Sequence, residues 1–204
     1  MPLQNRVTPF SELVAVPERG MFMGNRGLLH NDEQRIVRFN RGRRWIICLT
    51  SFKGWHRPVM RPGLYTELFF LDEATALAAG HRPCMECRPD ALRFRQAWAQ
   101  AAERDPAISF ADLDRELHEE RLAGPGVMRR WAAECAALPD GAMVAVGGDA
   151  FLVHGGELAR WSPAGYSNPQ PFEGIAEVLT PRSIVGAIAA GYAPALHPSA
   201  RSTS

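Results

Sequence analysis

The sequence predicts an α+β fold, because its strand and helix signals are grouped in separate parts of the chain. Residues rich in β-branched and aromatic side chains gather in 44–71 and again in 142–179, and helix signals dominate between them. A length of 204 residues with 46% hydrophobic residues is enough to bury a substantial core. We expect a small mixed domain over residues 1–106, followed over 107–204 by helices and a small β-rich part that can pack against it as one unit.

The first region is expected to hold two strands. Residues 1–30 show no sustained hydrophobic period, and three glycines within 20–27 predict a loop that other backbone or a ligand can approach closely. The run 44–52 predicts a strand buried on at least one face, and 65–71 predicts a second, shorter one. Between them, prolines and glycines predict a turn-rich connection.

The middle of the chain predicts helices. Asp72 suits the N-cap of a short helix over 73–79, and Gly80 suits the left-handed residue that ends it. A second helix is expected from about residue 90 to 104. A third should open at Ser109 and end near 122, and a fourth should cover 127–137.

The last quarter returns to β-structure and ends with a helix. A turn at 139–141 leads into a predicted hairpin of 142–146 with 151–154. Residues 161–166 predict a loop that presents Trp161 and Tyr166, and 175–179 predicts another strand. Thr180 followed by proline predicts the start of a helix that runs to residue 190.

No membrane partner is expected, because the longest mostly apolar run falls short of the roughly 20 residues that span a bilayer. The first residues show no basic segment followed by an apolar one, so we expect a cytoplasmic protein. In that compartment, four cysteines favour metal ligands and core thiols over a disulfide framework. The sequence does not indicate an oligomeric state.

Charge is divided unevenly along the chain. Residues 1–63 carry eleven Lys and Arg against four Asp and Glu, giving +7, and the remainder carries a compensating excess of acid. Lys53 is the only lysine, and the planar arginine side chain suits bidentate contact with phosphate or carboxylate. This pattern favours an anionic ligand, although the two halves could also simply neutralise each other.

Cys84 and Cys87 form a CxxC turn between two predicted helices, and both thiols of such a turn can point at one metal ion. The start of the following helix favours the negative charge of the sulfurs. A CxxC turn is a common half of a tetrahedral zinc site, so Zn²⁺ is the expected cofactor and the other ligands must come from elsewhere in the chain.

The run 69–90, FFLDEATALAAGHRPCMECRPD, resembles the zinc-binding domain of the Ada DNA-repair methyltransferase. The similarity is strongest there and extends over about residues 45–98. In that family four cysteines bind zinc, and one of the first pair accepts a methyl group from a DNA phosphotriester. Cys84 and Cys87 match the second pair, so the resemblance implies zinc binding and a role in DNA repair or modification.

The first cysteine pair of the family is absent. Its counterpart here is the segment from His56 to Met60, with an imidazole and a thioether in place of two thiols. A thioether is a poor zinc ligand, and imidazole is not the metal-bound thiolate that accepts a methyl group. We therefore do not expect self-methylation of the Ada type.

Other residues must complete the metal site. Cys48, in the strand before the turn, is the expected third ligand, and its alternative is a buried core thiol. His30 and His56 compete for the fourth position. His81 replaces an apolar aromatic residue of the family and is a weaker candidate, and Cys135 is expected to be structural.

Recognition of DNA or a related phosphate-bearing ligand is the expected function. Basic residues flank the strand and turn near the predicted metal, and Trp45 and Trp55 between them could stack on bases or belong to the core. The residues expected to bind phosphate or nucleic acid are Asn25, Arg26, Arg43, Arg44, Lys53, Arg57 and Arg61.

The alternative is a zinc-dependent enzyme, a hydrolase or transferase, acting on a nucleotide-like substrate. Three protein ligands and a water form the usual catalytic arrangement. Glu67 could then act as general base, with Asn25 and Arg26 holding an anion. A third reading is an interaction module in which zinc only stabilises the fold. The sequence contains no Ser-His-Asp pattern, phosphate-binding loop or dinucleotide fingerprint.

Overall fold

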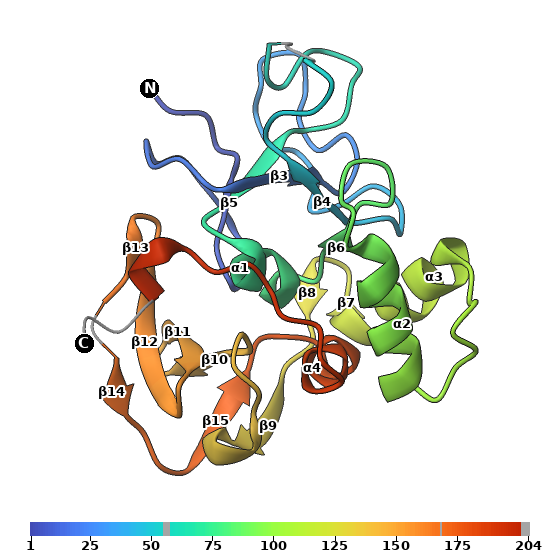
Figure 1. The fold of residues 1–204 in the computed structure, drawn as a ribbon. Helices are drawn as coiled ribbons and strands as arrows, with labels where there is room; N and C mark the ends of the chain where they lie inside the picture. The colour runs from blue at the N-terminus through green and yellow to red at the C-terminus, as the bar shows by residue number, and fades with distance from the viewer. Residues whose placement is uncertain (55–57, 168, 201–204) are drawn as a thin grey trace.

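A computed structural model describes residues 1–54, 58–167 and 169–200. It shows an α+β fold, as predicted, in which two sheets lie on either side of a short central helix and three further helices pack beside them (Figure 1). Among the described residues, no helix is both long and apolar enough to cross a bilayer.

The first sheet has the strand order β2-β1-β5-β3-β4-β6. The pairs β1–β5 and β4–β6 are parallel and the others antiparallel. One face is apolar and covered by helices, and the other carries half-buried side chains that include Cys48. Its strands are β1 (Arg6–Val7), β2 (Leu13–Val14), β3 (Phe22–Asn25), β4 (Ile46–Leu49), β5 (Leu68–Phe70) and β6 (Arg82–Pro83).

The loop predicted over residues 20–27 is wrong, because β3 lies there in the middle of the sheet. Gly24 explains both the error and the strand. A Cβ at this position would lie 2.1 Å from the Ile46 carbonyl oxygen, so only glycine lets the two strands approach this closely. The glycine that suggests a loop in the sequence is thus a packing requirement of the sheet.

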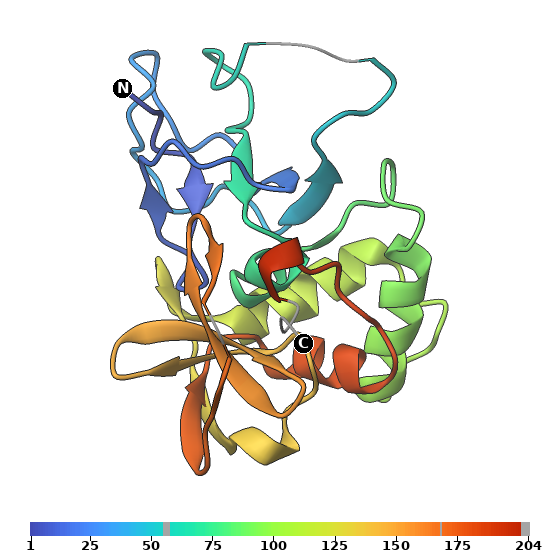
Figure 2. The ribbon, with the colours of Figure 1, turned by 60° about the vertical axis from the view of Figure 1, so that its left-hand side comes forward.

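Helix α1 (Glu73–Ala78) lies between the two sheets, and all of its residues are buried (Figures 1 and 2). Ala76 and Leu77 belong to the core under the first sheet, whereas Ala74 and Ala78 belong to the core of the second. The predicted cap is confirmed, since the Asp72 carboxylate accepts from the Thr75 N–H. Gly80 has the expected positive φ, 79°.

Three more helices complete the first core, namely α2 (Ala91–Ala101), α3 (Phe110–Arg121) and α4 (Arg182–Ala189). Phe94 and Trp98 from α2 pack in the same cluster as Ile184 and Ile188 from α4. Residues from both sides of the predicted boundary at 106 and 107 therefore share one core. The predicted Thr180 cap is wrong, because Pro181 occupies that position and the Thr180 hydroxyl accepts from Met143 N–H at 2.9 Å.

The helix predicted over 127–137 is also wrong. This segment forms β8 (Val127–Met128), β9 (Trp131–Glu134) and a short 3₁₀ turn, and β8 pairs with β7 (Leu122–Gly124). Burial alternates along β9, which pairs with β15 at the edge of the second sheet. Pairing in the sheet overrides the helix preference of the alanines.

The second sheet has the order β13-β12-β11-β10-β15-β9. Its predicted hairpin is confirmed, with positive φ at Gly147 and Gly148. The loop predicted over 161–166 is instead a hairpin whose aromatic side chains reach α1: Trp161 Nε1 donates to Thr75 Oγ1 and Tyr166 donates to Asp72. The remaining strands are β10 (Met143–Val146), β11 (Asp149–His154), β12 (Glu157–Ser162), β13 (Gly165–Tyr166), β14 (Gln170–Pro171) and β15 (Ile175–Val178).

Candidate metal centre

Cys48, Cys84 and Cys87 come together where β4 and β6 pair side by side. The Cys84 N–H donates to the Ile47 carbonyl at 2.8 Å, which continues the parallel pairing as far as the CxxC turn. The three sulfur atoms all lie within 4.8 Å of one another. A tetrahedral zinc–thiolate site, with Zn–S bonds of about 2.3 Å, requires sulfurs about 3.8 Å apart, so a small contraction of this cluster would hold a metal ion.

The surroundings of the sulfurs suit a cation. The Cys48 thiol donates a hydrogen bond that lowers the pKa of Cys84 to about 5, and backbone N–H groups of Glu86 and Cys87 act in the same direction. That bond and burial raise the pKa of Cys48, and burial raises the pKa of Cys87. These surroundings favour a thiolate at Cys84 and oppose ionisation of its two neighbours. A bound cation is what would allow all three to be thiolates.

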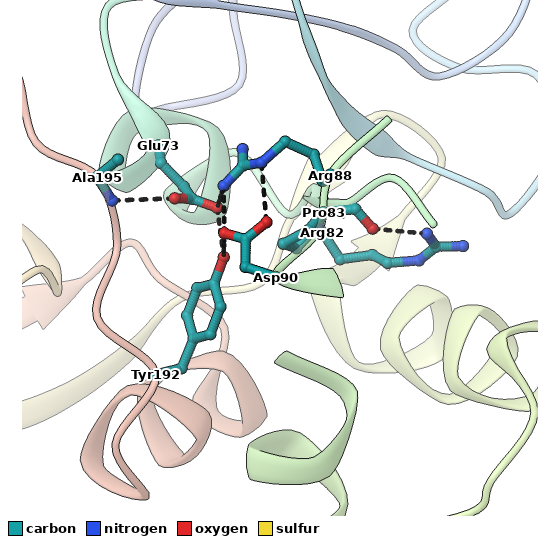
Figure 3. A network of polar contacts seen from close by, with 7 residues as sticks. All are labelled: Glu73, Arg82, Pro83, Arg88, Asp90, Tyr192 and Ala195. Carbon is teal, nitrogen blue, oxygen red and sulfur yellow. Dashed lines mark hydrogen bonds and ion pairs between the residues drawn. The ribbon is translucent and has the colours of Figure 1, made fainter. Parts of the chain in front are cut away.

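A buried ion-pair network fixes the exit of the CxxC turn (Figure 3). Arg88, the residue after Cys87, bonds Glu73 at 2.9 Å and Asp90 at 2.5 Å. The Tyr192 hydroxyl donates to Glu73 at 2.6 Å, and the Ala195 N–H donates to the other oxygen of that carboxylate at 2.9 Å. The turn is therefore tied to α1, to α2 and to the chain after α4.

Arg82 fixes the other side of the turn. Its Nε and Nη2 form a bidentate pair with Asp114 of α3, at 3.0 and 2.7 Å. Its Nη1 donates to the Pro83 carbonyl at 2.8 Å (Figure 3). Sequence reasoning did not identify Arg82, Arg88 or their partners as supports of the site. The feature of the sequence that could have indicated the two arginines is the Arg-Pro dipeptide on each side of the two cysteines.

His30 does not join the cluster. Its Nδ1 lies 2.6 Å from Thr66 Oγ1 and its Nε2 lies 3.2 Å from the Arg61 carbonyl oxygen, so both ring nitrogens bond to groups of the protein. The competing candidate, His56, lies outside the described residues. His81 is buried against Trp45 and Phe70 and is also outside the cluster, and Cys135 is buried in the 3₁₀ turn after β9.

The structure separates the predicted phosphate-binding residues into two groups. Arg43, Arg44, Lys53 and Arg61 are exposed, whereas Asn25 is half-buried and accepts from the Gly27 N–H. Arg57 lies outside the described residues, as does Trp55.

Arg26 is not a surface residue, which corrects its assignment to a ligand-binding loop. Its guanidinium is buried between Phe39 and Trp45, donates twice to Ser11, and has its pKa lowered to about 9 by burial. Trp45 is fully buried with Arg121 4.0 Å from its ring, so it belongs to the core and is not available to stack on a base.

Glu67 is buried away from the cysteine cluster. Its Oε2 accepts from the Met60 N–H at 2.7 Å, and its carbonyl accepts from the Asn5 side chain at 3.1 Å. These bonds give Glu67 a structural role in holding two segments of the chain. Its role as a general base stays a prediction from the sequence.

Comparisons of this chain with protein-family models, with curated proteins and with solved structures give no match.

Proposed function

We propose that Cys48, Cys84 and Cys87 bind Zn²⁺ and that this centre stabilises a surface that binds DNA or another phosphate-bearing ligand. The observation that carries the proposal is the convergence of three sulfurs, from two separate segments, within 4.8 Å. Thiolates select soft or borderline ions, and zinc is the usual ion in a thiolate site of this kind. When bound, zinc would supply a fixed positive centre and a Lewis acid.

The segment before β4 provides the phosphate-binding surface in this proposal. Among the described residues, none of its exposed arginines has a carboxylate within 4 Å, and each is free to contact an anion. Its two acidic residues, Asp32 and Glu33, leave an excess of positive charge. The arginine segment, as we call it, comprises Arg35, Arg38, Arg41, Arg43 and Arg44.

The resemblance to the Ada zinc domain supports DNA as the ligand and a role in DNA repair or modification. The missing first cysteine pair makes methyl transfer to a metal-bound thiolate of that pair a poor candidate. Binding through arginine and phosphate needs neither of those thiols.

Metal analysis tests the zinc part of the proposal. The purified protein should contain one equivalent of zinc, and Cys48→Ser, Cys84→Ser and Cys87→Ser should each lower zinc affinity by more than about 100-fold, because a ligand is lost. Cys135→Ser, which removes a thiol outside the cluster, is the matched control and should keep full zinc content. Equal zinc content in all four variants would contradict the assignment.

Salt dependence tests the nucleic-acid part. Binding of a short DNA duplex should weaken with added salt, and the double variant Arg41→Gln, Arg44→Gln should lower the slope of log K against log salt by about 2. Arg93→Gln, which removes an exposed arginine from α2, should leave both affinity and slope unchanged. A flat salt response of the native protein would exclude this function.

A zinc-dependent enzyme is the second candidate, because three side chains of the described part of the chain converge on the site. A fourth position taken by water would favour catalysis, whereas a histidine would favour a closed structural site. X-ray absorption of the zinc-loaded protein and of His56→Ala separates these outcomes. Loss of a nitrogen ligand in the variant would argue against catalysis.

A further inference from the structure

One row of side chains leads across the first sheet from the cysteine cluster. Arg6 on β1 is paired with Phe69 on β5, Phe69 is paired with Met23 on β3, and Met23 is paired with Cys48 on β4. Paired residues of neighbouring strands project from the same face. These four side chains are half-buried and lie on the face opposite the apolar core.

A pocket of about 510 Å³ opens at the far end of this row. That volume lies in the range of roughly 300–1,000 Å³ that is usual for small-molecule sites. Phe69 lines the pocket, and so does Thr50, which is two residues beyond Cys48. The polar and charged residues that line it are Asn5, Arg6, Arg19 and Thr50.

The guanidinium of Arg6 is held in place at the pocket. It lies 4.8 Å from the centre of the Phe69 ring, and it donates to the Glu18 carbonyl at 2.5 Å and to Asn5 Oδ1 at 2.6 Å. Those two bonds use Nε and Nη1. Within the described part of the chain, no carboxylate lies within 4 Å of this guanidinium, although the Glu18 side chain is near enough to offset part of its charge.

Arg19 brings a second positive charge to the same pocket. Burial, and then the charge of Arg19, lower the pKa of Arg6, so the two guanidinium groups repel each other. The segment that carries Arg19 lies tightly against β5, since a Cβ at Gly20 would lie 2.0 Å from the Phe70 carbonyl oxygen. The fold therefore holds two like charges at one pocket, where an anion would relieve their repulsion.

A second large pocket, in the described part of the chain, has no such pair of unneutralised arginines. It measures about 660 Å³ and is lined by residues of β12 and β13 and by Phe10. Its arginine, Arg160, is paired with Asp149 at 2.8 Å. An anion there would have to replace an existing carboxylate partner.

We propose that the pocket of Arg6 and Arg19 binds a phosphate ester, with the phosphate on the two guanidinium groups and the organic part over Phe69 toward the cysteine cluster. Two strand spacings separate Phe69 from Cys48, or roughly 10 Å. A ligand the size of a mononucleotide spans that distance. The inference rests on the proposed function in that it adds a second phosphate-binding place, on the zinc-bearing sheet, to the arginine segment.

Binding of phenyl phosphate, with inorganic phosphate as a second probe, tests the pocket by calorimetry of the zinc-loaded protein. Phenyl phosphate should bind more tightly, because Phe69 contacts its ring. Arg6→Gln and Arg19→Gln should each weaken its binding by about tenfold, as expected for the loss of a charge-assisted hydrogen bond. Arg160→Gln and Arg93→Gln are the matched controls and should change the dissociation constant by less than about twofold.

Proximity to the metal is tested by replacing zinc with cobalt. The ³¹P signal of bound phenyl phosphate should broaden in the cobalt-loaded protein and stay sharp in the zinc-loaded protein. Unchanged binding in the Arg19→Gln variant, or no broadening in protein that is shown to contain cobalt, would overturn the proposal. Arg19 is exposed, so its variant decides the question even if Arg6→Gln fails to fold.

The two proposals can fail separately. If the protein binds no metal but phenyl phosphate binding still depends on Arg6 and Arg19, the metal centre is wrong and the phosphate pocket stands without its link to a metal. In the opposite case, metal binds and DNA affinity depends on Arg41 and Arg44, but phenyl phosphate binding is unchanged in the Arg6 and Arg19 variants. The assignment of the pocket is then wrong and the proposed function stands.

Discussion

At the scale of single residues, His81 shows why a metal-ligating residue type is not enough to identify a ligand. Its ring is fully buried against Trp45 and Phe70, with centroid distances of 5.2 and 4.8 Å. Nδ1 lies 3.1 Å from the Ala79 carbonyl oxygen, and in the described part of the chain Nε2 has no hydrogen-bond partner. Burial, and then the charges of Arg26 and Arg121, hold the pKa of His81 well below its usual 6.5.

The position of His81 predicts an acid sensitivity. The unfolded chain takes up a proton at this residue below about pH 6.5 and the folded chain does not, so stability falls as the pH falls, by about 1.4 kcal/mol per pH unit. His81→Phe fits the apolar site and should remove that part of the pH dependence. Urea unfolding at pH 7.5, 6.5 and 5.5 with saturating zinc measures it.

The control for His81→Phe is His154→Gln, which changes a partly exposed histidine at the end of β11. It should keep the full slope of stability against pH. Equal slopes for the native protein and His81→Phe would show that the ring becomes protonated in the folded state.

Single residues also show which features of the site could be predicted from the sequence and which could not. Cys48 was predictable as a member of the cluster, because a thiol on a strand that pairs beside the CxxC turn can face the two cysteines of that turn. His30 and Arg26 were not, because their burial depends on Thr66 and Ser11, which are remote in sequence and polar in their own right. The sequence shows which residues have the right chemistry for a site, but tertiary contacts decide whether each side chain is accessible to a ligand.

At the scale of secondary structure, the close contact of β3 with β4 controls the position of Cys48. Gly24 lies opposite Ile47, next to the pair formed by Met23 and Cys48. Gly24→Ala places a Cβ against the Ile46 carbonyl, which is backbone and cannot move aside without displacing β4. We expect a loss of several kcal/mol, on the order of 3, together with weaker zinc binding.

Gly124→Ala is the matched control, because a Cβ there meets nothing within 4 Å and the residue has no positive φ. Its effect on the free energy of unfolding should stay within about 0.5 kcal/mol. Chemical denaturation and zinc titration of both variants check the prediction. Native zinc affinity in a destabilised Gly24→Ala would show that the cluster does not depend on the strand pair.

Secondary structure was predictable where local chemistry and tertiary packing agree. Asp72 and Gly80 mark both ends of α1 in the sequence, and two glycines mark the turn between β10 and β11. Residues 22–25 and 131–134 were assigned incorrectly because glycine and alanine favour other conformations locally. Their strand state comes from neighbours more than 20 residues away.

At the scale of the whole molecule, α1 joins the two sheets into one structure. Its alanines are small enough to be buried against both sheets. Its cap residue, Asp72, links α1 to the second sheet and to the C-terminal segment. The Asp72 carboxylate accepts from Thr75 of α1, from Tyr166 of β13 at 2.9 Å and from the His197 N–H at 3.1 Å. The boundary expected at residue 106 left open that the two parts pack as one unit, and the bond between residues 72 and 166 is a contact that the sequence does not reveal.

This link predicts that the described parts of both sheets unfold together. Tyr166→Phe removes a hydrogen bond to a buried carboxylate and should cost about 1–3 kcal/mol. Because α1 belongs to both cores, hydrogen exchange should accelerate by a similar factor in β4 and in β11. Arg160→Gln, which breaks an exposed ion pair with Asp149 on the same sheet, should cost less than about 1 kcal/mol and change neither region. Faster exchange confined to β11 in Tyr166→Phe would mean that the second sheet opens independently of the metal centre.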